Sequence, residues 1–276
     1  MKLHSWNAEA HNLRYADFSG GLDLSDSNFN LSWLDSARFT QANLTRAAFS
    51  YATLTNADVT FADTRGAQSL DLSGAISRNA ILPDRTIATL DLAAGDRLLV
   101  RDDDGMSDPP PTIWLTPRQP IAVTIRDHLN MGEGGVLELL FDADPWDSLI
   151  SFQSIIPVQF GGTLEFTFAD DVEVATHIGR TFHIFDWTGA EPTGAFAVAS
   201  QYPWDVSQLY TTGGVWLLLP GDTNSDGIVD IIDLNNVRNY FGISAPHAVP
   251  EPRTLQLTIG ISLGLVALAL RQRREF

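Results

Sequence analysis

Ala37-Arg38-Phe39-Thr40-Gln41-Ala42-Asn43-Leu44-Thr45-Arg46-Ala47-Ala48-Phe49 is the stretch that decides how the first third of this 276-residue chain folds. Its large apolar residues recur every five positions, and an alanine stands two positions before each of them. A helix repeats every 3.6 residues and a strand every 2, so neither keeps a five-residue pattern on one face. The chain must therefore turn a corner every five residues, which predicts a square solenoid.

The five-residue period extends well beyond this stretch. One extra residue interrupts it, between Phe18 and Leu24, and the small residue of each repeat is always alanine from Ala37 to Ala62. The large apolar column consists of Leu13, Phe18, Leu24, Phe29, Leu34, Phe39, Leu44, Phe49, Leu54 and Val59. Corners at this spacing keep the whole column inside the solenoid.

Residues 11–64 resemble the pentapeptide-repeat family, as in Ala42–Arg46 and Asn56–Thr60. The resemblance implies a right-handed quadrilateral β-helix, in which twenty residues close one coil and the Leu/Phe column fills the axis beneath the alanines. The same tripeptide, Leu-Asp-Leu, occurs at Leu70–Leu72 and again twenty residues later at Leu90–Leu92. We therefore place the β-helix over residues 1–92.

The amino-acid composition excludes several kinds of chemical site and partner. Hydrophobic residues make up 44% of it, which is enough apolar material to fold. It has no cysteine, and this excludes disulfides, thiolate zinc sites, iron–sulfur clusters and a cysteine nucleophile. The net charge of −17 argues against nucleic acid as a partner. Some pentapeptide-repeat proteins mimic DNA, but residues 1–67 hold 5 basic and 7 acidic residues, too weak a charge for that role.

Residues 93–219 form an acidic, β-rich domain in this interpretation. Strand-like runs such as Ile121–Ile125 and Leu164–Phe168 alternate with turn signals such as Gly161-Gly162. The pattern predicts an antiparallel sandwich or a continued β-solenoid. Gly162–Phe168 and Thr181–Asp186 resemble β-rich modules of surface proteins from planctomycete-type bacteria, a resemblance that names no activity.

Candidate chemistry in this domain is sparse. Asp102–Gly105 with Asp108 is either a calcium cup or, as we prefer, a solvated turn. The acidic residues around Trp146 are either a glycosidase pair or, as we prefer, a surface loop; they are Asp142, Asp144 and Asp147. The histidines lack the spacing of a zinc protease; they are His128, His177 and His183. The tryptophans have two possible roles, which are stacking on sugar rings and packing in the interior of the domain. They are Trp114, Trp146, Trp187, Trp204 and Trp216.

The most specific chemical motif is Asp222-Thr223-Asn224-Ser225-Asp226-Gly227-Ile228-Val229-Asp230-Ile231-Ile232-Asp233. Oxygen donors at positions 1, 3, 5, 9 and 12 and a glycine at position 6 suit Ca²⁺. The predicted ligands of one ion are the side chains of Asp222, Asn224, Asp226, Asp230 and Asp233 and the carbonyl of Ile228.

A short helix should follow this loop and end at Gly242. Residues 220–244 then resemble a dockerin type I repeat, in which aspartate is usual at position 12. A full dockerin has two such repeats. Only one is present here, which weakens the expectation of cohesin as a partner but leaves calcium binding in place.

The last segment, residues 245–276, has three parts in order. Val249-Pro250-Glu251-Pro252 is followed by the uncharged stretch 254–270 and then by Arg271, Arg273 and Arg274. The uncharged stretch is long enough to predict a transmembrane helix with a cytoplasmic C-terminus. Together the parts resemble the PEP-CTERM sorting signal, which implies export, processing by an exosortase and delivery to the cell surface or exopolysaccharide.

These observations predict an all-β protein: a quadrilateral β-helix, a β-sandwich or β-solenoid-like domain, a calcium loop with a helix, and a C-terminal transmembrane helix. No export signal follows Lys2 and the repeat begins uncapped, so we expect a fragment or a late-assigned start. The predicted function is a non-enzymatic, exported structural or interaction protein, single-pass in the cell membrane before processing. The alternative is an extracellular glycan-binding or glycan-active module.

Overall fold

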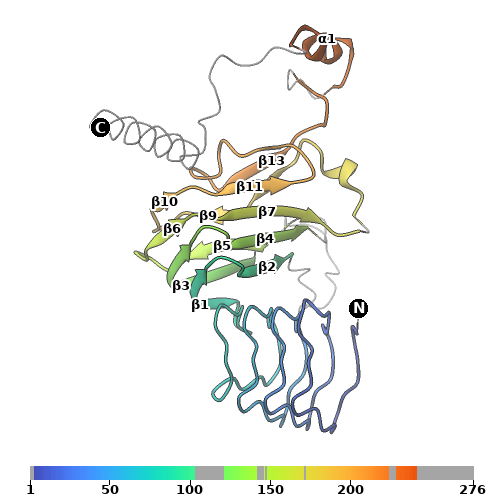
Figure 1. Ribbon diagram of the computed structural model, residues 1–276, viewed down its shortest axis with the longest axis vertical. Helices are drawn as coiled ribbons and strands as arrows, with labels where there is room; N and C mark the ends of the chain where they lie inside the picture. Colours follow the sequence, from blue (N-terminus) through green and yellow to red (C-terminus); the bar gives the residue numbers. More distant parts are fainter. Residues whose placement is uncertain are drawn as a thin grey trace, which may run out of the picture. The chain divides into compact units, whose positions relative to one another are not determined.

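The computed structural model describes residues 3–102, 121–141, 146, 148–170, 172–223 and 228–240. The chain divides into two compact units, Met1–Ile228 and Val229–Phe276. The first unit contains square coils followed by the strands β1 to β13, and the second contains the helix α1 (Ile231–Tyr240). Figure 1 shows the square coils in blue and the strands in the colours that follow along the chain.

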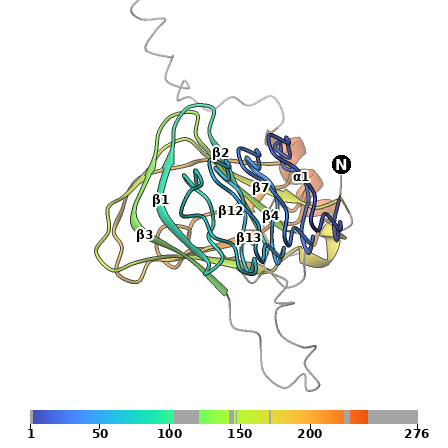
Figure 2. The same ribbon diagram turned by 90° about the horizontal axis from the view of Figure 1, so that it is seen from below.

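Parallel backbone bridges join each square coil to the next. Asp23 is bridged to Asn43, and Asn43 to Asp63, so one coil takes 20 residues, as predicted. The first coil is one residue longer, because Asn7 is bridged to Asn28. The extra residue falls at Gly20 and Gly21, which both have positive φ. Figure 2 shows the successive coils from below, again in blue.

Every fifth residue of the square coils forms a corner. Gln41, Arg46 and Tyr51 have φ of 64°, 60° and 61°, and the next residue bonds back across the turn, as where the N–H of Ala42 donates to the Phe39 carbonyl at 2.9 Å. This is the type II turn, which requires positive φ at its third residue. The left-handed conformation is unfavourable for a non-glycine residue. The corner amides offset this cost by donating to the next coil, as Gln41 does to Thr60 at 3.0 Å.

The interior of the square coils is the predicted apolar column. Its members from Leu24 to Val59 are at most 5% exposed. Equivalent rings of successive coils stack, Phe18 on Phe39 at 5.0 Å and Phe29 on Phe49 at 5.1 Å. The alanine column is also buried, apart from the partly buried Ala52, and its small side chains let the interior pack closely. Burial of each large side chain contributes about 1.5–3 kcal/mol relative to exposure.

The coils change character after Gly66. The bridges shorten to 18 residues, from Asp58 to Ile76 and from Asp63 to Ile81, and Leu90–Leu92 belong to a strand. The elements that follow are β1 (Thr86–Leu92), β2 (Arg97–Arg101), β3 (Ile121–Met131), β4 (Val136–Phe141), β5 (Ser148–Phe152), β6 (Val158–Phe160), β7 (Thr163–Phe168), the 3₁₀ helix η1 (Val174–His177), β8 (Thr181–His183), β9 (Phe185–Asp186), β10 (Pro192–Gly194), β11 (Ala197–Ser200), β12 (Trp204–Asp205) and β13 (Gly214–Leu217).

These strands build two parallel sheets. One has the order β10-β6-β3-β5-β9 with β1 also on β3, and the other has the order β11-β7-β4-β2. All pairs within both sheets are parallel. Of the two predicted alternatives, the structure therefore has the β-solenoid, and the antiparallel sandwich is wrong. We call this second stack the wide coils. In Figure 1 the square coils lie side by side along the horizontal direction, whereas the wide coils are stacked along the vertical direction.

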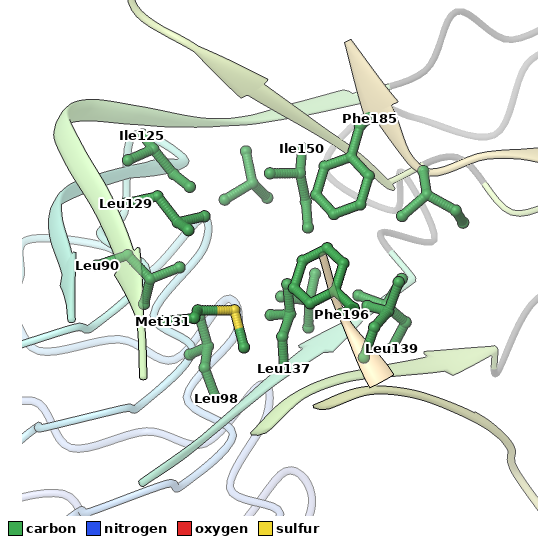
Figure 3. Close-up of a cluster of buried hydrophobic side chains, with 14 of the residues drawn as sticks. Leu90, Leu98, Ile125, Leu129, Met131, Leu137, Leu139, Ile150, Phe185 and Phe196 are labelled. Atoms are coloured by element: carbon green, nitrogen blue, oxygen red, sulfur yellow. The ribbon is translucent and has the colours of Figure 1, made fainter. Parts of the chain in front are cut away.

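The core of the wide coils lies between the two sheets. Strand β4 alternates between buried and half-buried residues, and the register aligns Leu98, Leu137 and Leu164 from three successive coils. Side chains from both sheets converge in this core, among them Leu139 and Ile150 (Figure 3). Parallel stacking in register thus gives each strand the same inward face as the one before it.

Residues of the square-coil region close the first edges of both sheets. The Asn79 side chain forms two hydrogen bonds with the backbone of β1, donating to the Asp91 carbonyl at 2.7 Å and accepting from the Asp91 N–H at 2.9 Å. The carbonyls of β2 accept from Gln41 at 3.4 Å and from Arg65 at 2.9 Å. Edge strands expose unpaired backbone groups that invite aggregation. These side chains satisfy part of that backbone.

Arg65 is the centre of this junction. It is 3% exposed and forms a buried ion pair with Asp63 at 2.7 Å, with further bonds to the Ser148 hydroxyl at 3.0 Å and the Arg101 carbonyl. Phe61 and Ile81 from the square-coil region belong to the core of the wide coils. The two stacks keep separate cores, and these two side chains attach the square-coil region to the core of the wide coils.

A small antiparallel sheet, β8-β13-β12, covers another part of the wide-coil core. Its inner residues Phe182, Val215 and Leu217 are at most 4% exposed, and Phe182 contacts Phe141 at 5.0 Å between ring centroids. We call these three strands the cap sheet. Because its other face is turned away from the core, the cap sheet is a place where a binding surface can form.

Ion pairs link exposed faces of neighbouring square coils. Arg46 donates two hydrogen bonds of 2.8 Å to Asp26, one coil earlier. This interaction holds the pKa of the Asp26 carboxyl below its ordinary value. A weaker contact of 3.4 Å joins Arg38 to Asp17, where both side chains are more than half exposed. Such pairs contribute little individually because solvent screens them.

The predicted fold class and membrane location need correction at the C-terminal end. The described residues are mostly strands with one short helix, and no helix among them is long and apolar enough to cross a membrane. The helix α1 has 10 residues, a length of about 15 Å against a hydrocarbon core of about 30 Å. The predicted single-pass membrane location is therefore wrong for the described residues. The segment 254–270 lies outside the described residues.

The junction predicts a large effect of Arg65→Ala. The substitution leaves the Asp63 carboxylate buried without its partner, so we expect the free energy of unfolding to fall by about 3–5 kcal/mol in urea titration. Arg38→Ala is the matched control, since its ion pair is exposed, and it should cost no more than about 1 kcal/mol. Equal losses in the two variants would show that the junction does not hold the stacks together.

The Asp26–Arg46 pair predicts a pH-dependent contribution to stability. The pKa of Asp26 is lower in the folded state, so the contribution is present above the unfolded pKa, about 3.9, and is lost as the pH falls through the folded pKa. We expect Asp26→Asn to cost less than about 1 kcal/mol at neutral pH and nothing in strong acid. Urea unfolding from neutral to acidic pH measures this. In an Arg46→Gln background the pH dependence of the difference should shrink, and its persistence would assign it to another group.

Candidate functional site

The predicted calcium loop is only partly described. Residues 224–227, which include Asn224 and Asp226, lie outside the described residues. Asp222 belongs to the first unit, as does Ile228, whereas Asp230 and Asp233 belong to the second. Within the described part of the chain, no group of three or more His, Cys, Asp or Glu side chains is placed to hold a metal ion.

Asp230 and Asp233 organise the beginning of α1. Asp230 Oδ1 accepts the N–H of Ile232 at 2.7 Å, and Asp233 Oδ2 accepts the N–H of Asp230 at 2.8 Å. This reciprocal arrangement satisfies amide groups that a helix start leaves unpaired. The helix expected after the loop is therefore present, and both carboxylates have a structural role there. The apolar residues Leu234 and Val237 are 60% and 51% exposed on it.

The other predicted acidic sites fall largely outside the described residues. Asp102 follows β2 and is 7% exposed. Residues 103–120, 142–145 and 147 are not described, so neither the Asp103–Asp108 cluster nor the carboxylates Asp142, Asp144 and Asp147 can be placed.

The three histidines have different surroundings. His128 on β3 lies 3.1 Å from both carboxylate oxygens of Asp91 on β1. His177 in η1 is buried between the rings of Phe168 and Phe182, at 5.7 and 6.0 Å. His183 is exposed on the cap sheet. The first two are accounted for by hydrogen bonding and by packing, and His183 belongs to the site described next.

Among the tryptophans named from the sequence, three described rings pack against other rings, and two, Trp187 and Trp216, line pockets. Trp187 is parallel to Phe152 at 5.2 Å, and its Nε1 donates to the Leu209 carbonyl at 2.8 Å. Trp204 stacks on Phe141 at 5.5 Å, and Trp146 lies 4.6 Å from the same ring. Trp114 lies outside the described residues. Trp216 on β13 has no aromatic contact among the described residues and is half-buried.

Trp216 lines an open pocket of about 700 Å³ on the outer face of the cap sheet, which we call the cap pocket. The volume lies in the range of small-molecule sites, about 300–1,000 Å³. Its lining combines apolar and polar residues: Ile178, Gly179, His183, Asp205, Ser207, Gln208, Thr212, Trp216, Leu217, Leu218, Leu219 and Asp222.

Strand register brings the polar residues to the indole. Trp216 is directly opposite Thr181 on β8 and Asp205 on β12, and residues opposite each other across an antiparallel pair share a face. His183 is opposite Gly214, which has no side chain. A Cβ on Gly214 would lie 3.3 Å from Thr212 Oγ1. Glycine here keeps the pocket floor open beside the imidazole.

Local turns fix two of the polar side chains. Asp205 Oδ1 accepts the N–H of Ser207 at 2.8 Å. Gln208 Oε1 accepts the Thr211 hydroxyl at 2.9 Å, and its main-chain carbonyl accepts the N–H of Gly213 at 3.1 Å. The amide oxygen of Gln208 is therefore directed toward its own turn. In the Asp205 turn, the hydrogen bond uses Oδ1 and not Oδ2.

Sequence reasoning named Trp216 and His183 but did not bring them together, and it missed Asp205 and Gln208. The lining residues run from 178 to 222 and come from three strands and from the segments before, between and after them. The alternation Val215-Trp216-Leu217 carries a signal that Trp216 faces away from its neighbours. It does not say which face is the core.

Comparison with known proteins identifies one region. Residues 23–60 match the family of pentapeptide repeats, in eight copies. These residues lie in the square coils, so the predicted repeat is confirmed there. The match includes neither the cap pocket nor residues 222–233. No curated protein matches the chain.

Proposed function

We propose that this chain is a non-enzymatic structural and interaction protein that is exported from a bacterial cell. The observation that carries the proposal is the buried junction between the square and wide coils, where Phe61 and Ile81 enter the wide-coil core and Asp63 pairs with Arg65. Two stacks joined in this way form a stiff support, because parting them would expose apolar surface and a buried ion pair. Such a support suits a protein that holds a surface in place.

The C-terminal motif supports export as part of this proposal. Val249-Pro250-Glu251-Pro252 and the arginines Arg271, Arg273 and Arg274 are the residues that resemble the PEP-CTERM signal. On this reading an exosortase-type enzyme recognises the tail and cleaves near Pro250–Pro252. An exopolysaccharide is then a candidate neighbour of the exported protein. The proposal includes no membrane-spanning segment.

A chain given an added N-terminal export signal, with one tag directly after that signal and a different tag at the C-terminus, tests both parts of the proposal. In a bacterium that holds an exosortase-type enzyme, we expect exported protein with the N-terminal tag and without the C-terminal tag, whereas Glu251→Ala should keep both. The exported protein should release no reducing ends from the polysaccharide of its host. Sustained release that scales with protein concentration would contradict the non-enzymatic role, and retention of both tags on exported native chain would contradict the sorting step.

We also propose that the loop 222–233 binds one Ca²⁺ ion. Its support is the spacing of hard oxygen donors, Asp222, Asn224, Asp226, Asp230 and Asp233 with the Ile228 carbonyl, and the helix that follows. At the start of α1, Asp230 Oδ1 and Asp233 Oδ2 accept backbone N–H groups, which places both acidic residues where the loop meets the helix. Ca²⁺ would neutralise this group of acidic residues and order the loop before the helix.

Calorimetric titration of Ca²⁺ into the full chain checks this proposal. We expect saturable binding with a dissociation constant of about 10⁻⁴–10⁻³ M or tighter, as in extracellular modules, with a gain of helical circular dichroism. Asp226→Ala should abolish it, because the substitution removes one of the predicted side-chain ligands of the ion. Asp71→Ala, which removes an acidic residue from an exposed turn of the first unit, is the matched control. Binding that survives Asp226→Ala or is lost in Asp71→Ala would place the ion elsewhere.

A further inference from the structure

We propose that the cap pocket binds a pyranose ring of a neutral glycan, with Trp216 stacked against the apolar face of the sugar. The inference rests on the interaction role proposed above and gives it a site and a ligand class. The other tryptophans that the structure describes in the wide coils are stacked on aromatic rings, including Trp187, which lines a second pocket, whereas Trp216 contacts no other described ring and lines the cap pocket.

Hydrogen-bonding groups surround the indole without protein partners. Within the described residues, Trp216 Nε1, the His183 ring, Asp205 Oδ2 and the Gln208 amide nitrogen make no hydrogen bond with the protein. Donors and acceptors are both present in this set. A ligand with hydroxyl groups around its edge can satisfy them, and an aliphatic ligand would leave them unpaired at a cost.

The indole supplies the complementary apolar contact. Aromatic side chains bury a large area and also carry a polar edge, so they suit ligands with one apolar face. A pyranose ring has C–H groups on its faces and hydroxyl groups around its edge, which matches an indole ringed by Asp205, Gln208 and His183. The volume of about 700 Å³ exceeds one ring, and the open side admits a longer chain.

Charge selects among glycans. The lining contains the carboxylate of Asp205, which is not one of the proposed calcium ligands, and no lysine or arginine, on a chain of net charge −17. Uronate and sulfate groups would be repelled, since like charges disfavour approach and contact. The ligand class is therefore a neutral glycan.

The fold holds the site ready for binding. Val215 and Leu217, on either side of Trp216, are 0% and 1% exposed in the core below. The anchored strand fixes the backbone of Trp216, and the turn at Gln208 is closed by its own hydrogen bonds. Preorganisation of this kind reduces the entropy lost on binding.

Calorimetry on the full chain tests the proposal with hexasaccharides of glucose, mannose, galactose and xylose, and with a galacturonic acid hexamer as the charged probe. We expect at least one neutral hexasaccharide to bind with a dissociation constant of about 1 mM or tighter and the charged probe to bind at least about fivefold more weakly. Trp216→Ala should weaken neutral binding by at least about tenfold, and Trp216→Phe, which keeps a ring, should weaken it less.

Trp33→Ala is the matched control, because Trp33 is 49% exposed on the square coils, with Arg14 over its ring at 4.9 Å. It should leave glycan binding unchanged. Thermal unfolding of each variant separates loss of the site from loss of the fold, and Trp216→Phe and Asp205→Asn remain as tests if Trp216→Ala does not fold. Absence of binding by every neutral probe, or equal effects at Trp33 and Trp216, would overturn the site and leave the structural role standing. Cleavage of a bound hexasaccharide would instead overturn the non-enzymatic role and leave the site standing.

Discussion

Backbone hydrogen bonding between parallel coils is the interaction on which this structure depends. It pairs each coil with the next in register, from Asp23, Asn43 and Asp63 in the square coils to Leu98, Leu137 and Leu164 in the wide ones. It also leaves an unpaired edge wherever a stack begins or ends, and an open edge exposes both backbone and core. Several features of the first unit are explained by the need to close such edges.

The junction shows how one edge is closed with side chains instead of another strand. Asn79 offers β1 an acceptor and a donor, as a neighbouring strand would, and Arg65 binds a carbonyl of β2. An arginine at this depth needs a partner, because an unpaired buried charge is strongly unfavourable. Asp63 supplies it from the same coil. The polar groups of the junction therefore depend on one another, and they join two stacks that differ in coil length.

The cap sheet connects the fold to the candidate site. One face of it packs Phe182, Val215 and Leu217 on the wide-coil core, and this packing leaves Trp216 on the opposite face beside Asp205 and His183. The same alternation that seals the interior therefore creates the pocket. The parallel sheets offer no such place in their inner layer, because their inward residues are used for stacking from coil to coil.

The amino-acid sequence by itself determined the square coils, since a five-residue period forces a corner locally and each corner is visible in the pattern from Leu13 to Val59. It also located the helix after Asp230, whose capping residues are neighbours in the chain. Only the tertiary structure decided that the middle strands pair in parallel, because Val136 meets Arg97 and Thr163 across long separations that no local pattern encodes. It also decided that Arg65 is buried and that Trp216 faces outward. Both depend on which distant strands lie beside them, and a period of two fixes only that neighbouring residues face opposite ways.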